Sequence, residues 1–202
     1  MFESDYKWSS ESDVSPPIRG EDLPDFEGWV NFNGFSSRHP AYDYAAYLTD
    51  GGKCCVLGLP EGTPVRAVAD GTVYQVILDA PPYMRIINIE HGEVGTGVIS
   101  SYGHVVPSVS YRQKVTRGDV IGTLYKDPGN KRGRLVHLHF RMYHAWGSVR
   151  CGVNRPADPA LVFSRLDSFN AEPQSEPSFR ITELGDDVSI RIANFEELEL
   201  FK

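Results

Sequence analysis

The sequence predicts a mainly β domain with little helix, built as a sandwich or a barrel. The first observation is a series of short runs rich in β-branched and aromatic residues between residues 43 and 143. The second is the set of Gly- and Pro-containing turns that separates these runs at intervals of roughly ten residues, a spacing typical of all-β domains. The third is that residues 30–150 contain no pattern long enough for a helix of three turns.

The candidate strands follow a polar, acidic stretch, residues 1–22, which we interpret as an irregular N-terminal arm. Turns containing Gly, Pro, Asp or Asn separate the strands. One of them, Asp70-Gly71, is a hairpin signal, because this pair tolerates the positive φ angles of tight turns. The candidate strands are DYAAYL (43–48), CCVLGL (54–59), VRAVA (65–69), GTVYQVIL (71–78), MRIINIEH (84–91), GVISSYGHV (97–105), VIGTLY (120–125) and RLVHLHFRMY (134–143).

The composition changes after residue 164. Residues 165–202 contain nine acidic and four basic side chains, so they carry five of the seven net negative charges of the chain. A linker-like stretch comes first. The alternating runs FRITEL and VSIRI then flank the turn GDD and predict a C-terminal β-hairpin appendage, which either packs on the main sheet or stands apart. We therefore expect one domain over residues 23–164 and an acidic appendage over residues 165–202.

Composition and charge argue against several classes of protein. A hydrophobic content of 41% and a charged content of 23% are ordinary for a soluble globular domain. The net charge of −7 argues against a nucleic-acid-binding protein, which is usually basic. No apolar run is long enough to span a membrane, and the N-terminus lacks the pattern of a secretory signal. Cys54 and Cys55 lie in an apolar run and are expected in the core; with Cys151 they make an odd number, which excludes a complete disulfide framework.

Residues 135–140, LVHLHF, place two histidines on one face of a predicted strand. Side chains alternate across a strand, so Val136, Leu138 and Phe140 would point into the core, and His137 and His139 would point the other way. A His-x-His pair taken alone is either a half-exposed surface pair, which is the commoner case, or two members of a metal or catalytic site.

A second pair of candidate ligands precedes the strands. His39 and Asp43 are four residues apart in HPAYD, a spacing that could place both on one side of a short turn entering a strand. Catalytic zinc sites use three protein ligands and leave one position for water, so either His137 or His139 could complete a His2Asp set. The other histidine of that pair and His104 would then flank the water, whose pKa the zinc ion lowers from ~15.7 toward ~7.

Six segments between residues 34 and 163 resemble, in their order and spacing, those of the lysostaphin-type zinc endopeptidases, enzymes that cut bacterial cell-wall peptides. The segments are HPAYD (39–43), GTPVRAVADGTV (62–73), INIEHG (87–92), SYGHV (101–105), VTRGDVIGTL (115–124) and HLHF (137–140). This ordered set is far more specific than a single His-x-His pair.

The resemblance implies a role for each candidate residue. It implies that His39, Asp43 and His139 bind one Zn²⁺ ion and that His104 and His137 are the catalytic pair. It also implies a twisted antiparallel β framework with a barrel- or sandwich-like core, a peptide substrate from the bacterial cell wall, and a location in the cell envelope or outside the cell. Of the two remaining histidines, His91 is expected to be structural, and His144 is expected to lie beyond the core of the strand and to be exposed.

Three features depart from the family pattern. Ala41 stands where the family commonly has Gly, so a positive φ angle there would be costly. The loop before the His-x-His strand is basic, and it either meets a carboxylate of the substrate or is an ordinary solvated loop, which we favour. No export signal is visible, so the location is left open between the envelope and the cytoplasm. The basic residues of the loop are Lys126, Lys131, Arg132 and Arg134.

Two other functions compete with a zinc endopeptidase. A non-catalytic relative would bind wall peptides or regulate another hydrolase, but such domains typically lose a ligand, and here all five positions are filled. A biotinyl- or lipoyl-type carrier needs a Lys at a hairpin tip, usually between Met residues, and none of the three Met residues adjoins a Lys. We therefore expect a zinc metalloendopeptidase, favoured as a monomer, that acts on peptidoglycan cross-links or stem peptides.

Overall fold

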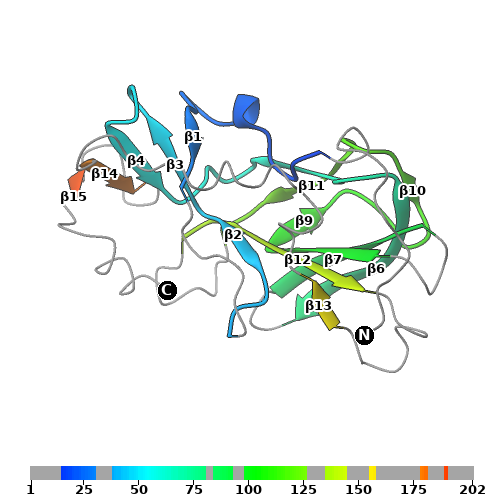
Figure 1. Ribbon diagram of the computed structural model, residues 1–202. Coiled ribbons are helices and arrows are strands. Elements are labelled where there is room, and N and C mark those ends of the chain that lie inside the picture. Colours follow the sequence, from blue (N-terminus) through cyan, green and yellow to red (C-terminus); the bar gives the residue numbers. More distant parts are fainter. Residues whose placement is uncertain are drawn as a thin grey trace.

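The computed structural model describes residues 15–30, 38–80, 84–92, 98–126, 135–144, 155–157, 178–181 and 189–190. These residues form fifteen strands and one 3-10 turn, η2 (Gly20–Asp22), which confirms the prediction of a mainly β chain with little helix. The strands build three sheets, and in the described part of the chain none of the three closes into a barrel (Figure 1). No described helix is long and apolar enough to cross a membrane.

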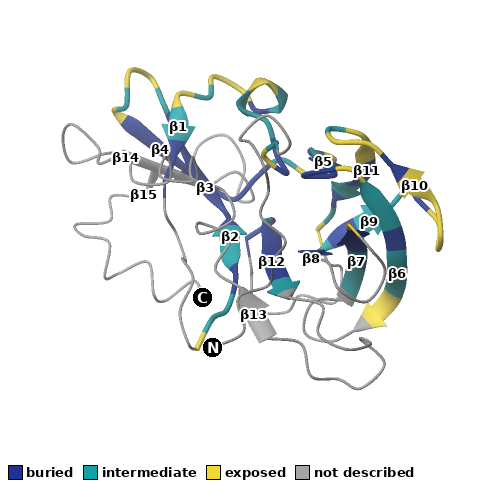
Figure 2. Cartoon of the chain, turned by 45° about the vertical axis from the view of Figure 1, so that its right-hand side comes forward, coloured by how far each residue is buried: buried dark blue, intermediate teal, exposed yellow. Residues whose placement is uncertain are grey.

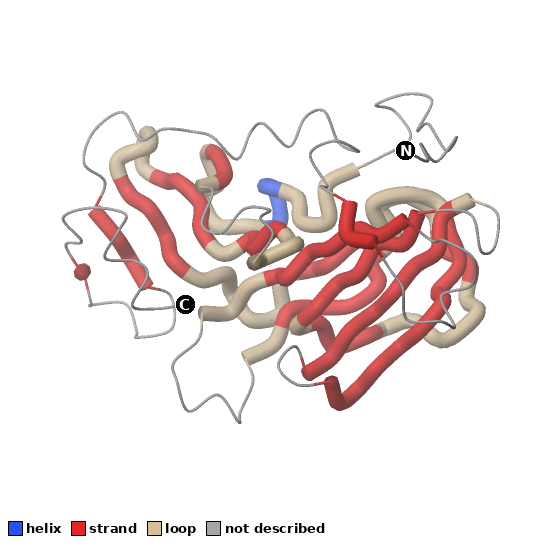
Figure 3. Tube along the Cα trace, turned by 60° about the horizontal axis from the view of Figure 1, so that its bottom comes forward, coloured by secondary structure: helices blue, strands red, loops and turns tan. Residues whose placement is uncertain are grey.

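The largest sheet has seven strands, and every pair of neighbours in it is antiparallel. Its long strands lie side by side in Figure 3. Burial changes across the sheet, because β8 and β12 are mostly buried, whereas β6 becomes exposed toward its C-terminal end (Figure 2). The order is β10 (Lys114–Val115), β6 (Gly71–Ala80), β7 (Met84–His91), β8 (Val98–Gly103), β12 (Leu138–His144) and β13 (Arg155–Ala157), with β2 (Tyr42–Tyr44) paired to the first half of β12.

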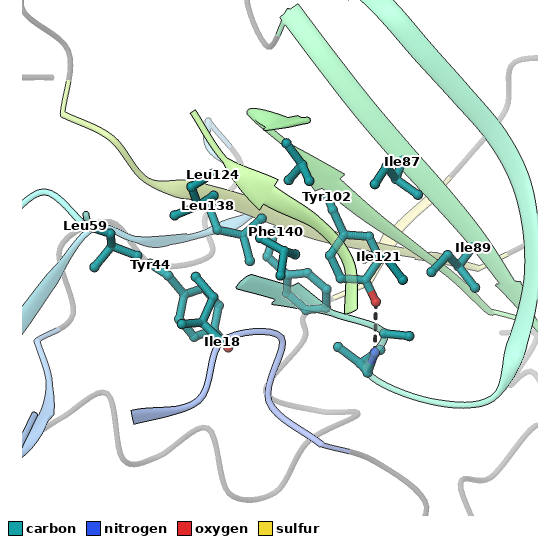
Figure 4. Close-up of a cluster of buried hydrophobic side chains, with 14 of the residues drawn as sticks. Ile18, Tyr44, Leu59, Ile87, Ile89, Tyr102, Ile121, Leu124, Leu138 and Phe140 are labelled. Atoms are coloured by element: carbon teal, nitrogen blue, oxygen red, sulfur yellow. Dashed lines mark hydrogen bonds between the residues drawn. The ribbon is translucent and has the colours of Figure 1, made fainter. Parts of the chain in front are cut away.

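The main core contains side chains of this sheet and of a three-stranded sheet, β5 (Pro64–Arg66), β11 (Val120–Leu124) and β9 (Val105–Pro107). Strand alternation sends Leu138, Phe140 and Met142 to the same face of β12, and all three are fully buried. Figure 4 shows Phe140 and Leu138 among large side chains from both sheets. The predicted inward face of the His-x-His strand is therefore confirmed.

The third sheet has five strands, β1 (Gly28–Trp29), β3 (Ala46–Thr49), β4 (Cys54–Leu57), β14 (Ser178–Ile181) and β15 (Ser189–Ile190). It lies to the left of the large sheet in Figure 1, with β2 between them. Cys54 and Cys55 are buried in β4 with free thiols, as expected, and burial raises the pKa of Cys55 to about 12. The predicted C-terminal hairpin is present, because β14 and β15 pair antiparallel, and β14 also pairs in parallel with β4.

The described end of the N-terminal arm, residues 15–22, packs against the core. Ile18 is fully buried, and the backbone N–H of Arg66 donates to the carbonyl of Pro17 at 2.8 Å. The Arg66 guanidinium pairs with Asp22 at 3.0 Å. The segment is irregular in backbone but contributes an apolar side chain to the main domain, whose predicted start at residue 23 stays a prediction.

The predicted hairpin at Asp70-Gly71 is wrong. The strands on its two sides, β5 and β6, belong to different sheets, and Gly71 is not among the described residues with a positive φ angle. Glycine is needed there for a different reason, since a Cβ at Gly71 would lie 2.6 Å from the Glu90 carbonyl oxygen and 2.8 Å from Nδ1 of His91. The close approach of β6 to the end of β7 therefore selects glycine.

A buried chain of hydrogen bonds begins at the same place. The backbone N–H of Val68 donates to the Tyr102 hydroxyl (Figure 4), which contacts Ser100 Oγ at 3.0 Å. Ser100 Oγ lies 2.7 Å from Nε2 of His91, whose Nδ1 lies 2.8 Å from the Asp70 carbonyl oxygen. A carbonyl only accepts, so Nδ1 carries the proton and a neutral ring satisfies every partner. His91 is therefore structural, as expected.

Candidate metal centre

The pairing of β2 with β12 brings the two predicted half-sites together. In this antiparallel pair Asp43 lies directly opposite His139, and opposite residues project from the same face of a sheet. His39 precedes β2, in a turn where the N–H of Ala41 donates to the His39 carbonyl at 2.8 Å. Ala41 is not among the described residues with a positive φ angle, so replacing the family's usual Gly causes no strain of that kind.

Three potential ligand atoms converge in this arrangement. Nδ1 of His139 lies 2.8 Å from Oδ1 of Asp43, and Nε2 of His39 lies 3.2 Å from Oδ2 of Asp43. The two imidazole nitrogens are 3.3 Å apart, and one ligand atom from each residue falls within 4.8 Å of the others. Two imidazole nitrogens and one carboxylate oxygen are the ligand types of many catalytic zinc sites. The donor set therefore fits a zinc ion with a position left for water.

The charge state of the cluster suits metal binding. Burial alone would raise the pKa of Asp43, but hydrogen bonds with His139 and His39 and the nearby His137 hold this pKa well below its usual value. Burial lowers the pKa of His139 to about 4, with Asp43 opposing the shift and Arg141 adding to it. At neutral pH the carboxyl group is therefore ionised and the His139 ring is neutral, the states that a metal requires of its ligands.

His137 stands immediately before β12 and faces the cluster. Its Nδ1 lies 2.8 Å from the carbonyl oxygen of Leu135, so Nδ1 must carry a proton and donate it. The other nitrogen, Nε2, lies 3.9 Å from Oδ1 of Asp43. In a neutral ring Nε2 then has a lone pair on the cluster side and can accept a proton there.

His104 lies in the connection between β8 and β9, and its ring is next to that of His137 in a tilted arrangement, with centroids 4.5 Å apart and planes at 53°. Its centroid is 6.4 Å from that of His139. The backbone of His104 has φ 64, a left-handed conformation that is uncommon for a residue other than glycine, and its N–H donates to the Arg85 carbonyl at 2.9 Å. Strained backbone of this kind concentrates at functional sites.

The five predicted site residues are thus brought together, three as converging ligand atoms and two beside them. Sequence reasoning missed Arg141, whose Nε donates to Nε2 of His139 at 2.6 Å, and Tyr143, whose hydroxyl accepts from Nη1 of Arg141 at 3.2 Å. Strand alternation carries the signal, since 137, 139, 141 and 143 share one face.

The predictions about His144 and the basic loop stay predictions. His144 is the last residue of β12, and its expected exposure lies outside what the structure describes. Cys151 and residues 127–134, which hold most of the basic loop, lie outside the described residues.

The chain is similar to known proteins over its central half. The family model described as Peptidase family M23 matches residues 52–152, a range that includes His104, His137 and His139 and begins after His39 and Asp43. The cell division protein DipM of Caulobacter vibrioides (strain NA1000 / CB15N) is 32% identical over 107 residues, which are 52% of this chain and 16% of that protein. The chain therefore spans a small part of that relative's length.

Two solved structures of lysostaphin share the fold. The antimicrobial peptidase lysostaphin from Staphylococcus simulans superposes with a TM-score of 0.52 and 16% identity, over 82% of this chain and 59% of that chain. A solution structure of lysostaphin gives 0.50 and 16%, over 77% and 55%. At this identity the likeness concerns the fold, and it agrees with the predicted lysostaphin-type β framework.

Proposed function

This chain belongs to peptidase family M23, and from that premise we propose that it is a zinc-dependent endopeptidase that hydrolyses peptide bonds in peptidoglycan cross-links or stem peptides. The single observation that carries the proposal is the convergence of His39, Asp43 and His139 within 4.8 Å. Adjacent to them are two histidines, and one of these, His137, has its Nε2 on the side of the cluster. These are the parts that metal-assisted hydrolysis requires.

In the proposed mechanism His39, Asp43 and His139 are the metal ligands. Zn²⁺ held by them would polarise the carbonyl of the scissile bond and make a neighbouring water more acidic. The register of β2 against β12 fixes two of these ligands, so their geometry is set by the backbone before any ion binds.

His137 is the proposed general base. The bond from Nδ1 to the Leu135 carbonyl fixes the tautomer and the ring orientation, so Nε2 takes the proton of the attacking water. The same proton can then pass to the leaving amine.

His104 is the proposed partner that stabilises developing negative charge on the carbonyl oxygen. Its ring lies next to that of His137, with ring centroids 4.5 Å apart, and an imidazole N–H can donate to an oxyanion. This assigns separate tasks to two residues that the sequence alone could not distinguish.

Two experiments test this function. Zinc content is measured on protein purified without added zinc, and hydrolysis of peptidoglycan fragments is followed by mass spectrometry, with and without a chelator. We expect about one zinc per chain and chelator-sensitive release of peptides. Stable binding of wall peptides without hydrolysis by the zinc-loaded chain would favour the non-catalytic alternative, a domain that binds wall peptides or regulates another hydrolase.

The place of action and the assembly state follow from the proposed substrate. Peptidoglycan lies in the cell envelope, so we propose that the chain acts there. We also propose that it acts as a monomer, since all five site residues come from one chain.

A further inference from the structure

A hollow with a volume of about 110 Å³ lies beside the candidate metal centre on the same face of the large sheet. Its position follows from the strand register. Gly103 of β8 lies opposite both His139 and Ile86, and in the next row Ser101 lies opposite both Arg141 and Asn88. The lining residues are Ile86, Asn88, Ser101, Gly103, His139, Arg141 and Tyr143. The hollow is thus a continuation of the metal centre across β12, β8 and β7.

Arg141 gives this hollow its charge. Among the described residues that line it, Arg141 is the one side chain with a permanent charge. Its guanidinium has two partners: Nε donates to Nε2 of His139 at 2.6 Å while Nδ1 of that ring carries the proton, and Nη1 donates to the Tyr143 hydroxyl at 3.2 Å whichever nitrogen of His139 is protonated. These bonds keep the planar group on the site face of β12, between the metal centre and the far end of the hollow.

The other polar groups complete a surface suited to an anion. The Tyr143 oxygen accepts from Arg141, so its own O–H can donate to a ligand. Ser101 adds a hydroxyl, whereas Asn88 donates through Nδ2 to Gln75 at 3.0 Å and is not counted among the donors of the hollow. Gly103 adds no side chain, which leaves the middle of the hollow open. A guanidinium next to hydroxyl donors is the usual means of recognising a carboxylate.

We propose that this hollow is a substrate subsite that receives a carboxylate, held by Arg141 with Tyr143. The inference rests on the proposed peptidase function and narrows its substrate class to peptides with an acidic group close to the cleaved bond. Residues 139 and 141 are two positions apart on a strand, which is ~7 Å. A peptide residue spans roughly 3.5 Å, so the carboxylate belongs one or two residues from the scissile bond.

The carboxylate can come from an acidic side chain or from a free C-terminus, and matched peptides distinguish the two. The probes are capped five-residue peptides of Gly and Ala with one Glu or Gln at each position in turn, and a further pair ending in a free carboxylate or an amide. Binding to the full, zinc-loaded chain is measured by calorimetry, and cleavage is followed by mass spectrometry in the same samples. The acid-to-amide ratio is taken from Kd, or from kcat/KM where a peptide is cleaved.

We expect at least one acidic peptide to bind roughly 10- to 100-fold better than its amide counterpart, the scale of a hydrogen bond to a charged group. In Arg141→Gln this ratio should fall to near one. Arg141→Lys should keep part of it, because it keeps the charge but not the planar fork, and Tyr143→Phe should lower it several-fold. Arg112→Gln is the matched control, since its exposed guanidinium stacks on Tyr111 in the turn before β10, and it should leave the ratio unchanged.

The outcomes separate this subsite from the peptidase function. The subsite proposal is overturned if folded, zinc-loaded Arg141→Gln has the same acid-to-amide ratio as the wild type. It is also overturned if the wild type prefers no acidic peptide over its amide counterpart. If Arg141 only orients His139, the variant will weaken acid and amide peptides equally, which also overturns it. An acid preference without any cleavage supports the subsite and contradicts the peptidase. If Arg141→Gln fails to fold or to hold zinc, an unchanged ratio in both Tyr143→Phe and Arg141→Lys overturns the subsite.

Discussion

Asp43 and His139 face each other across the β2–β12 pair, with Oδ1 and Nδ1 2.8 Å apart. The two residues are 96 positions apart in the sequence. Their contact therefore depends on the register in which β2 pairs with the distant strand β12. A shift of that register by one residue would turn one of the two side chains to the opposite face. The geometry of the candidate metal centre therefore depends on this strand pairing.

Replacing Asp43 with Ala should remove the single carboxylate from the proposed ligand set. We expect zinc content to fall well below one per chain and hydrolysis to fall to the background rate, because two imidazoles alone bind the ion weakly. Metal analysis and a peptide-release assay measure the two effects. Asp79→Ala, at an exposed position of β6, is the matched control and should keep both properties. Full zinc occupancy in Asp43→Ala would show that the ligand assignment is wrong.

The two histidines of the His-x-His pair should behave differently. His139→Ala should lose the metal, whereas His137→Ala should keep it and lower kcat by roughly 10²–10⁴, the usual effect of a positioned acid or base. Zinc content and steady-state kinetics on both variants measure the difference. Equal loss of zinc in the two variants would mean that both side chains are ligands, and a different proton acceptor would then be needed.

The strands and the site residues could be predicted because their signals are local. Turn residues delimit β6 and β7, and alternation separates Phe140 from His139. The pairing of distant strands has no such local signal, and this is why the sequence left open where the hairpin of β14 and β15 packs. The hairpin predicted at Asp70-Gly71 was wrong for the same reason, because a contact between distant residues selects this glycine. Tight packing against Glu90, rather than a positive φ angle, excludes a side chain there.

Arg141 is a site residue that could not be predicted from the sequence. Alternation from His139 already places it on the site face, but an arginine two residues after a ligand is more often a solvated surface residue. Only the hydrogen bonds to His139 and Tyr143 show that the guanidinium is held within the site.

The buried His91 should make stability depend on pH. Burial lowers the pKa of folded His91 from 6.5, so the unfolded chain binds the proton first as the pH falls. The stability that neutral His91 contributes is complete above about pH 6.5 and is lost progressively below it. Unfolding free energies of the metal-free chain should therefore be lower at pH 5 than at pH 7.5. His139 has the same sign, with a folded pKa of about 4.

The variant His91→Gln separates the contribution of His91 from that of His139. It should lose about 1–3 kcal/mol of stability at pH 7.5, since it leaves buried polar groups without partners. Its decrease in stability between pH 7.5 and pH 5 should be smaller than that of the wild type. Parallel pH profiles for the two proteins would show that His91 titrates alike in the folded and unfolded states.

Gly71→Ala should destabilise the junction of β6 with β7. The added Cβ would lie 2.6 Å from the Glu90 carbonyl oxygen and 2.7 Å from Cγ2 of Ile89, and backbone can give way only by shifting the strand pair. We expect a loss of about 1–3 kcal/mol, the usual cost of overpacking, measured by denaturant unfolding. Asp79→Ala, exposed on the same strand, should stay close to the wild type. A neutral effect of Gly71→Ala would show that the two strands are further apart in solution.

Removal of the acidic appendage should leave the metal centre intact. A chain that ends at Ser164 keeps β2 and β12, which hold Asp43 and His139, and it loses β14 and β15. We expect it to fold, bind one zinc and hydrolyse a wall peptide at least as fast as the full chain. Because β14 pairs in parallel with β4, the truncation should also free one edge of a fully buried strand, and an unpaired edge promotes association.

Hydrogen exchange can separate these two effects of the truncation. The amides of β4 that bond to β14 should exchange faster in the truncated chain, since their partners are gone, and the unfolding temperature should fall. The amides of β8 are the internal control, because β8 is paired on both sides by β7 and β12 and belongs to a different sheet from β14 and β15. Unchanged β8 protection with retained zinc places the domain boundary near residue 164. Loss of zinc and of β8 protection together would mean that β14 completes the main fold and that the domain extends beyond residue 164.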